Sequence, residues 1–391
     1  MEKIRVFTAF SGYDSQCLSL DRLKKKYPEF DYELVGWSEI NKYAIQAHNA
    51  IYPQWADRNY GDISKINWDV VPDFDLFTYS SPCQDFSNAG LQRGGEEGSG
   101  TRSSLLWECR RVIVAKKPKF LLMENVAALV SQKFLPLFNK WQAELARYGY
   151  SNFAQVLNAK DYGIPKNRER IFLVSVLGEA WYNFPQPFKL EKRLKDVLET
   201  NVDEKYYLSE KTIAMFANTL TTSYNQDVVV SEPKAVSYTR DSKGKTQNKH
   251  LNEIVNTIHS STGSSGNTDC FVAEPKVQQI GNIYPDKEGF KNRTAGRIFS
   301  ADGLSPTLRT MSGGHQEPKI KFCYRIRKLT PRECFRLMDV DENVIDTIQA
   351  AGISNSQQYK LAGNSIVVAC LEKIFEQMFF PQYTNSRTLF G

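Results

Sequence analysis

A lone cysteine follows a short apolar run and opens a polar loop. The stretch TYSSPCQDFSNAG, from Thr78 to Gly90, places Cys83 directly after Pro82. The loop that follows, NAGLQRGGEEGSGTRSS, is too polar and glycine-rich to bury a thiol, and it resembles a lid that closes over a ligand. Free cysteine is more often simply buried. A thiol at the end of a strand and beneath a lid is nevertheless a candidate nucleophile.

An acid and two arginines follow later in the chain. In LLMENV, Glu124 directly follows an apolar run, where a carboxyl group without a role would be costly to desolvate. It could cap the next helix, or its pKa could be raised by burial, which would suit it to proton donation. In YGIPKNRERIF, Arg168 and Arg170 flank Glu169, so on a strand both guanidinium groups would point to one face. They could belong to a solvated edge strand or form a fork for a carbonyl or phosphate oxygen.

Earlier strand ends carry residues that suit a ligand with a ribose and an adenine. Gly12 lies in FTAFSGYDSQ, where a strand turns into a helix; Glu39 ends the next strand in GWSEIN, and Asp62 follows in YGDIS. The acids could hold ribose hydroxyls, and Ile40 and Ile63 beside them could sandwich the flat base. A tight strand–helix turn is the alternative, because the full GxGxxG pattern is absent. A phosphate-loop lysine motif is also absent, which argues against a triphosphate.

Alternating strand and helix patterns would bring these residues to one edge of a sheet. The order predicts a mostly parallel sheet with helices on both faces. We expect strands at Ile4–Phe10, Tyr32–Ser38, Leu76–Ser80, Phe120–Glu124 and Arg170–Val176, and helices at Ser15–Lys26, Tyr43–Ile51, Leu105–Val114 and Leu135–Tyr148.

The amino-acid composition of the chain changes near Pro185–Pro187. Residues 190–320 are rich in Ser, Thr, Asn, Gly and Lys and hold three similar stretches: NTLTTSYNQDVVVSEPKAV, NTIHSSTGSSGNTDCFVAEPKV and PTLRTMSGGHQEPKI. Each reads as strand, turn, strand, unless the similarity is chance. Helical patterns return at Thr330–Met338 and Gln357–Phe380, and the last of these needs the first sheet to pack on. We therefore expect an α/β domain at residues 1–187, an insertion at 188–324 and a return to the first domain at 325–391.

Composition limits the remaining choices. The 391 residues suffice for a large core and two lobes. The net charge of +6 hints at a polyanionic partner but decides nothing alone. Seven scattered cysteines without a CxxC pair and only four histidines favour reduced thiols and argue against a metal site. Neither a signal peptide nor a bilayer-spanning run is evident, so we expect a monomeric, cytoplasmic protein that does not enter a membrane.

The motifs SSPCQDFSNAG, LLMENV, KNRERIF and LAGNSIV, in this order, resemble those of the DNA (cytosine-5)-methyltransferases of bacterial and phage modification systems. Any one motif would be weak, but together they are highly specific, and they cover most of the chain outside about 190–320. The resemblance implies an α/β, Rossmann-like fold with a mostly parallel sheet, plus a smaller β-rich target-recognition domain. It implies methyl transfer from S-adenosylmethionine, with S-adenosyl-L-homocysteine as product, to carbon 5 of a flipped-out cytosine in a specific double-stranded DNA sequence.

The resemblance also implies roles for single residues. Cys83 would form a covalent adduct with the base, Glu124 would act at its pyrimidine edge, and Arg168 and Arg170 would anchor the base and the loop. The cofactor would contact Phe10, Ser11, Gly12, Tyr13, Glu39, Ile40, Asp62, Ile63, Leu105, Asn364 and Ser365. The DNA would contact Pro82, Gln84, Ser87, Asn125, Val126 and Thr307. Basic side chains of the insertion would contact phosphates, and its Ser, Thr, Asn and Gln would lie near base edges; no metal is implied.

One departure from the family concerns the first cofactor motif. Members usually show an acidic residue and a glycine-rich turn there. In this chain Thr8 takes the place of the acid, and Tyr13-Asp14-Ser15 fills the turn. The chain therefore departs from the family pattern where the methionine end of the cofactor would bind.

Three other functions compete with this interpretation. An RNA cytosine methyltransferase would use the same chemistry, although a long polar insertion favours the reading of DNA. An NAD-dependent oxidoreductase would need a fuller glycine motif and would leave Cys83 and Glu124 unexplained. A catalytically silent DNA-binding protein would have no use for the complete set of Cys83, Glu124, Arg168 and Arg170.

Overall fold

The structure is a computed structural model that describes residues 2–82, 102–206, 235–240, 246–252, 279–282, 297–300, 319–322 and 325–381. These residues divide into two compact units. The first unit holds the described residues up to Lys192 and from Thr330 onward, and the second holds those between Arg193 and Leu329.

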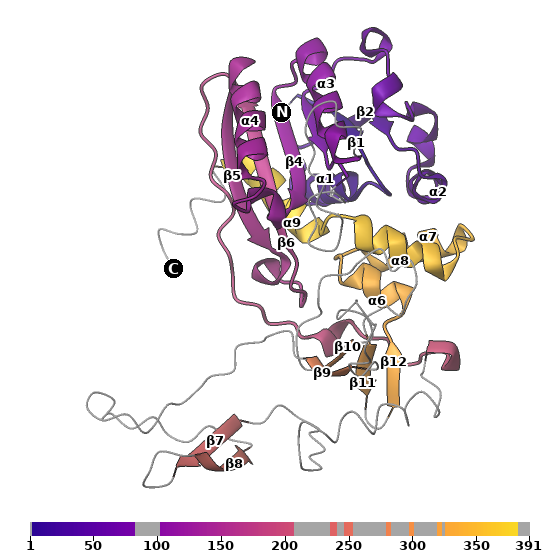
Figure 1. The fold of residues 1–391 in the computed structure, drawn as a ribbon. Helices are drawn as coiled ribbons and strands as arrows, with labels where there is room; N and C mark the ends of the chain where they lie inside the picture. Colours follow the sequence, from indigo (N-terminus) through magenta and orange to yellow (C-terminus); the bar gives the residue numbers. More distant parts are fainter. Residues whose placement is uncertain are drawn as a thin grey trace. The chain divides into compact units, whose positions relative to one another are not determined.

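The first unit is built on a six-stranded sheet with the order β2-β1-β3-β4-β6-β5 (Figure 1). β2, β1, β3 and β4 run parallel to one another, whereas β6 is antiparallel to both β4 and β5. The strands are β1 (Ile4–Ala9), β2 (Tyr32–Ser38), β3 (Leu76–Tyr79), β4 (Phe120–Val126), β5 (Tyr150–Asn158) and β6 (Glu169–Leu177). The sheet is therefore mostly parallel, as predicted.

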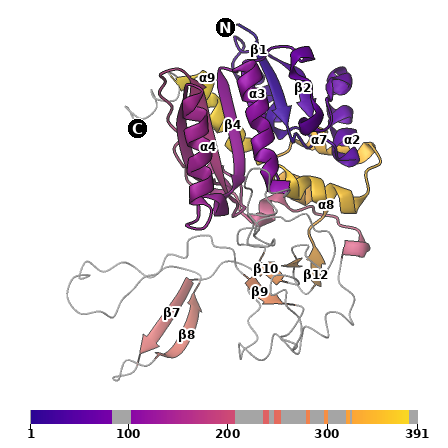
Figure 2. The same ribbon diagram turned by 45° about the horizontal axis from the view of Figure 1, so that its top comes forward.

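Helices cover both faces of this sheet. α3 (Glu108–Lys116) and α4 (Leu135–Arg147) lie on one face, and α1 (Ser15–Lys26) and α9 (Val368–Phe379) pack together on the other (Figure 2). The remaining α-helices are α2 (Lys42–Ile51), α6 (Pro331–Arg336), α7 (Glu342–Ala350) and α8 (Asn355–Asn364). Short 3-10 turns in this unit are η1 (Pro53–Arg58), η2 (Ile63–Lys65), η3 (Trp68–Val70), η4 (Arg102–Trp107), η5 (Ala127–Val130) and η6 (Ala159–Tyr162).

Covering both faces explains the composition of the central strands. Val6, Phe7 and Ala9 of β1 are all fully buried, so this strand is apolar on both sides, as is typical of parallel sheets between helix layers. The neighbouring strand must make room for the Phe7 ring. A Cβ atom at Gly36 would come within 2.7 Å of both Phe7 and Tyr60, so only glycine fits there.

The C-terminal segment completes the first unit through charged contacts with α1. The Arg22 guanidinium pairs with Asp339, Asp341 and Glu372, and Lys26 pairs with Glu376. These ion pairs join α1 to α9 and to the residues around the start of α7.

Several expected elements are wrong in detail. The single helix expected at Gln357–Phe380 is two helices, because the backbone turns extended at Ser365 (φ −75°, ψ 168°). The expected helix at Leu105–Val114 begins as the 3-10 turn η4. Strand β5 and helix α7 were not expected at all. β5 is an edge strand whose middle is exposed, so its sequence lacks a clear apolar alternation.

The second unit contains short strands and two 3-10 turns, η7 (Leu194–Val197) and η8 (Glu204–Tyr206). β7 (Ala235–Arg240) pairs with β8 (Thr246–Asn252). β9 (Gln279–Asn282), β10 (Arg297–Ser300), β11 (Lys319–Phe322) and β12 (Arg325–Lys328) form a separate sheet. β7, β9 and β11 each begin at or just after the Glu-Pro-Lys of one of the three similar stretches, and the rest of those stretches lies outside the described residues.

Candidate active site and cofactor site

The acid Glu124 is buried near the end of β4, with 8% of its surface exposed. Arg170 on the neighbouring strand β6 places its Nε 3.0 Å from the Glu124 Oε1. Burial raises the pKa of Glu124, and the positive charges of Arg170 and then Arg168 oppose that rise. The carboxyl group therefore keeps its proton to a higher pH than an exposed glutamate would.

The two arginines occupy different kinds of position. Arg170 lies in β6 opposite Val126 of β4, whereas Arg168 precedes the strand. β6 lies between β4 and β5, so the alternative of a solvated edge strand is wrong. The side-chain oxygen of Asn158 accepts from the Arg168 backbone N–H at 3.0 Å and fixes the chain just before β6.

Arg168 is almost fully buried and reaches the C-terminal end of α8. Its Nη2 donates to the carbonyl oxygens of Gly363, at 3.2 Å, and Ser365, at 2.7 Å. Carbonyl groups at a helix C-terminus lack partners within the helix and carry partial negative charge, so a buried guanidinium is stabilised there. The predicted cofactor residue Asn364 lies between them and is exposed.

A side-chain contact joins the end of β4 to the segment that leads into Cys83. Asn125 donates from Nδ2 to the Ser81 carbonyl at 3.2 Å, and its Oδ1 accepts from the Val126 N–H. The buried amide is thus used inside the protein, while Pro82 and Val126 are half-buried. The predicted residues Cys83, Gln84, Ser87 and Thr307 lie outside the described residues.

The turn after β1 has a left-handed backbone at several positions. φ is 55° at Phe10, 61° at Gly12 and 70° at Asp14. Glu39 binds this turn from the end of β2, because its Oε2 accepts from the Gly12 N–H at 3.0 Å. Its Oε1 accepts from the N–H groups of Ile40 and Asn41, each at 2.8 Å. The carboxylate therefore lies where β1 and β2 end side by side.

The Asp14 carboxylate lies beside Thr8, the position where the first cofactor motif lacks an acid. Its Oδ2 accepts from the Thr8 hydroxyl at 2.8 Å, and its Oδ1 accepts from the Cys17 N–H at 3.1 Å, which caps α1. Aspartate tolerates the left-handed conformation because its side chain bonds to nearby backbone groups. A glycine is therefore not needed at this position. Ser11 is buried, and its hydroxyl donates to the Thr8 carbonyl at 2.9 Å.

Tyr13 points into the protein. Its ring packs edge-on against Phe335, and its hydroxyl donates to the Ser365 Oγ at 2.8 Å. Burial raises the pKa of Tyr13 to about 12, so the phenol stays protonated and acts as a donor. The side chain thus has partners within the protein, and the cofactor contact that the resemblance implies for Tyr13 stays a prediction.

The two isoleucines expected to sandwich a base differ in exposure. Ile40 is 72% exposed, whereas Ile63 is 2% exposed and belongs to the core. Asp62 caps η2 by accepting from Ser64, which lowers the pKa of its carboxyl group. The Ser38 hydroxyl donates to the Gly61 carbonyl at 2.6 Å and ties the end of β2 to the segment before Asp62. Leu105, in η4, is half-buried.

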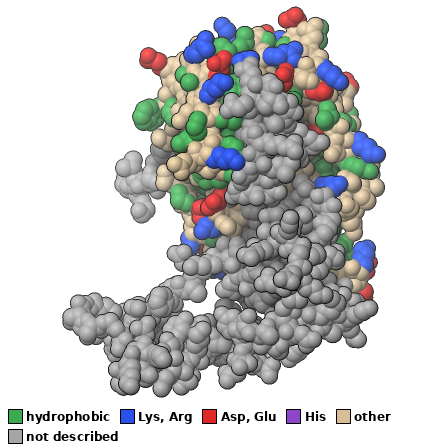
Figure 3. Space-filling model, viewed as in Figure 1, with side chains coloured by type: hydrophobic (Ala, Val, Ile, Leu, Met, Phe, Trp, Pro, Cys, Tyr) green, Lys and Arg blue, Asp and Glu red, His purple; other side chains and the backbone are tan. Residues whose placement is uncertain are grey.

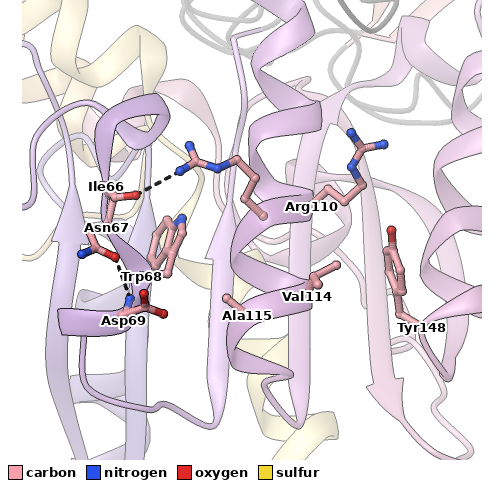
Figure 4. Close-up of a pocket in the computed structure, with 9 residues that line it drawn as sticks. Ile66, Asn67, Trp68, Asp69, Arg110, Val114, Ala115 and Tyr148 are labelled. Atoms are coloured by element: carbon pink, nitrogen blue, oxygen red, sulfur yellow. Dashed lines mark hydrogen bonds between the residues drawn. The ribbon is translucent and has the colours of Figure 1, made fainter.

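A hollow of about 460 Å³ lies elsewhere, beside the last turns of α3 (Figure 4). It is lined by Ile66, Asn67, Trp68, Asp69, Arg110, Arg111, Val114, Ala115 and Tyr148. None of the predicted site residues contributes to it. On the face seen in Figure 3, the described lysines and arginines lie among acidic and apolar side chains.

Comparison with known proteins agrees with the resemblance. The sequence model of the family "C-5 cytosine-specific DNA methylase" matches residues 4–379. The chain belongs to the C-5 cytosine-specific DNA methylase family. It is 32% identical to Type II methyltransferase M2.ScrFI of Lactococcus lactis subsp. cremoris, over 97% of this chain and 100% of that protein. It is 31% identical to Orphan methyltransferase M.SPBetaI of Bacillus phage SPbeta, over 99% of this chain and 100% of that protein.

Solved structures support the fold. Entamoeba histolytica methyltransferase EhMeth aligns with a TM-score of 0.65 at 15% identity, covering 98% of this chain and 99% of that one. A putative prophage-encoded DNA modification methyltransferase from E. coli aligns with a TM-score of 0.56 at 19% identity, covering 96% and 99%. The prediction of an α/β methyltransferase fold is confirmed.

Membership of this C-5 cytosine-specific DNA methylase family decides between the competing functions. The protein is a cytosine-5 DNA methyltransferase with S-adenosylmethionine as methyl donor. The oxidoreductase and silent DNA-binding alternatives are excluded, and the RNA alternative is not favoured. Among the described residues, no helix is long and apolar enough to cross a membrane.

Sequence reasoning missed one buried cation near this methylase's predicted site. Lys166 is fully buried, and its Nζ lies 2.7 Å from the Met338 Sδ. Burial, followed by the charge of Arg168, holds the pKa of Lys166 well below its usual range. The only sequence signal was its place in KNRER, next to the predicted arginines.

Proposed function

We propose that Cys83 attacks carbon 6 of a cytosine flipped out of double-stranded DNA, while Glu124 acts at N3. The observation that carries this proposal is the buried Glu124 carboxyl, whose Oε1 lies 3.0 Å from the Arg170 Nε. Asn125, the next residue of the strand, donates a hydrogen bond to Ser81 in the segment that leads into Cys83. β3 and β4 are adjacent parallel strands, so the proposed nucleophile and the acid would follow neighbouring strand ends. The flipped base is needed because its reacting atoms are inaccessible in a stacked duplex.

The proposed reaction has three steps: attack of the thiolate, transfer of the methyl group and loss of a proton. The Cys83 thiolate forms a bond to carbon 6, and Glu124 hydrogen-bonds N3 and the amino group as negative charge develops on the ring. Carbon 5, now electron-rich, would bond to the methyl group that S-adenosylmethionine supplies, with S-adenosyl-L-homocysteine as the leaving group. Loss of the carbon 5 proton to a base then restores the ring, breaks the sulfur–carbon bond and releases the thiolate.

The residues at the ends of β1 and β2 fit S-adenosylmethionine, which supplies the electrophilic methyl group. Glu39 would bind the ribose hydroxyls, because its carboxylate lies at this edge and already orders the turn at Gly12. Ile40 would cover the adenine, because an apolar side chain left 72% exposed gains from contact with a base. Asp62 and the backbone from Phe10 to Gly12 would complete the contacts.

Residues 188–324 would form the target-recognition domain, and the enzyme would act as a monomer. The short strands found there, and the many polar residues in the sequence of this segment, support this role, because polar side chains can reach base edges while lysines and arginines contact phosphates. Thr307 would contact the backbone of the flipped nucleotide.

The test of the chemistry is a trapping experiment. A duplex with 5-fluorocytosine at the target should form a denaturation-resistant complex with the protein when S-adenosylmethionine is present, because fluorine cannot leave as a proton does. Cys83→Ser should abolish trapping, whereas Cys109→Ser, at a fully buried cysteine of α3, should keep it. Equal trapping by Cys83→Ser and the unmodified protein would refute the assignment of the nucleophile.

The recognition role is tested separately with a chimera. Residues 188–324 are exchanged for the corresponding segment of a relative with a different target, and the product is read by bisulfite sequencing. We expect the methylated sequence to change while the chemistry is kept. An active chimera that retains the original sequence preference would refute this part of the proposal.

A further inference from the structure

We propose that the Tyr13 hydroxyl positions Arg168 through Ser365, so that hydrogen bonds join the cofactor turn to Arg168, whose charge acts on the acid Glu124. This inference rests on the proposed role of Glu124. It makes Tyr13 a positioning residue for methyl transfer, in place of a direct cofactor contact.

The first link joins the cofactor turn to the connection between α8 and α9. Tyr13 donates to the Ser365 Oγ at 2.8 Å, and the same Oγ donates to the Ala362 carbonyl at 3.0 Å. The Ser365 hydroxyl therefore has both its proton and a lone pair engaged. Because the phenol is buried, water does not readily replace Tyr13 as the donor.

The second link joins that connection to Arg168. The Ser365 carbonyl accepts from Arg168 Nη2 at 2.7 Å, which makes it the shorter of the two bonds from this nitrogen to the end of α8. Ser365 thus contacts Tyr13 with its side chain and Arg168 with its backbone. A shift of Ser365 would move the acceptor of a buried charge-assisted hydrogen bond, which is a strong and geometrically demanding interaction.

The third link is electrostatic. Arg168 and Arg170 both lower the pKa of Glu124 against the effect of burial. Arg170 contacts the carboxylate directly, whereas Arg168 acts from the end of α8. If Arg168 loses its fixed place, the pKa of Glu124 rises further. We call these three links from Tyr13 to Glu124 the relay. Breaking the relay should therefore change the pH dependence of the reaction as well as its rate.

The experiment compares Tyr13→Phe with Tyr150→Phe. The first change keeps the ring that packs on Phe335 and removes the hydroxyl. The control also removes a buried phenol hydroxyl, one that donates to the Pro118 carbonyl at 2.7 Å away from the predicted site residues. For both variants, kcat and KM for S-adenosylmethionine, the pH profile of single-turnover methyl transfer and the melting temperature are measured.

We expect Tyr13→Phe to lower kcat by about three- to tenfold, the range for losing one hydrogen bond in an aligned network, with KM changed less than about twofold. The alkaline limb of its pH profile should move to higher pH. Tyr150→Phe should leave kcat and this limb unchanged. If Tyr13→Phe does not fold, Ser365→Ala interrupts the same relay and should give the same pattern.

A raised KM with unchanged kcat would overturn the proposal and make Tyr13 a cofactor-binding residue. Unchanged kcat and an unmoved limb would show that the relay is inert. Failure of the underlying function is recognised separately. If Glu124→Gln keeps full activity and the same limb, Glu124 is not the acid, whatever Tyr13→Phe does.

Discussion

The side-chain amide of Asn125 donates to the backbone carbonyl of Ser81 across 3.2 Å. The residue that follows the proposed acid thereby holds the chain two positions before the proposed nucleophile. Because both groups are buried, the contact fixes the spacing of β3 and β4 where each strand ends.

Asn125→Ala should lower the rate of methyl transfer by about tenfold or more, because small misplacement of reacting groups is costly. Affinity for DNA should change little, because the described partners of the Asn125 amide, Ser81 and Val126, lie within the protein. The measurement is single-turnover methylation beside a DNA-binding titration. Asn152→Ala, which removes an amide that donates to Gln142 and Tyr150 carbonyls, serves as the control. Equal losses of rate in both variants would point to a general loss of structure.

Glu124→Gln should slow methyl transfer by about a hundredfold to ten-thousandfold, the usual range for a general acid. In the unmodified protein the rate should fall as pH rises through the Glu124 pKa, because the protonated form acts at N3. Burial raises that pKa, so this limb lies above the usual range of glutamate. The limb should be absent from the variant. A similar loss in DNA binding would indicate a structural role instead.

Lys166→Met should raise the free energy of unfolding by about 1–3 kcal/mol, since the fully buried amine has only a thioether as its described acceptor. The folded-state pKa of Lys166 lies below its unfolded value of about 10.4. Between these values the unfolded chain binds more protons, so stability should rise with pH there, and the variant should lose that slope. Lys119→Met, at an exposed lysine, is the control in urea unfolding. A destabilised Lys166→Met would show that the amine has a required partner.

Glu39→Gln should weaken binding of S-adenosylmethionine by about tenfold or more, because it replaces a charged hydrogen-bond acceptor. kcat at saturating cofactor should be largely retained. Equilibrium dialysis gives the affinity directly. Glu33→Gln, near the start of β2 and paired with Arg58, should bind the cofactor normally. Unchanged affinity in Glu39→Gln would remove Glu39 from the proposed cofactor site.

The sequence by itself determined the parallel core and the order of the site motifs. Strands such as Tyr32–Ser38 are apolar runs between amphipathic helices, and that local pattern is sufficient to predict β2 and α1 with their observed bounds. Glu39, Glu124 and Arg170 were found because polar residues directly beside apolar strands are conspicuous. The position of the strands in chain order placed them at one edge.

Only the tertiary structure decided how these residues are held. β5 and the break between α8 and α9 depend on long-range partners, the antiparallel pairing with β6 and the contact of Arg168 with Ser365. The inward direction of Tyr13 has the same origin, because its acceptor, Ser365, is 352 positions away in the chain. Local sequence sets propensity and periodicity, but buried hydrogen bonds are satisfied by whichever distant group the fold brings near.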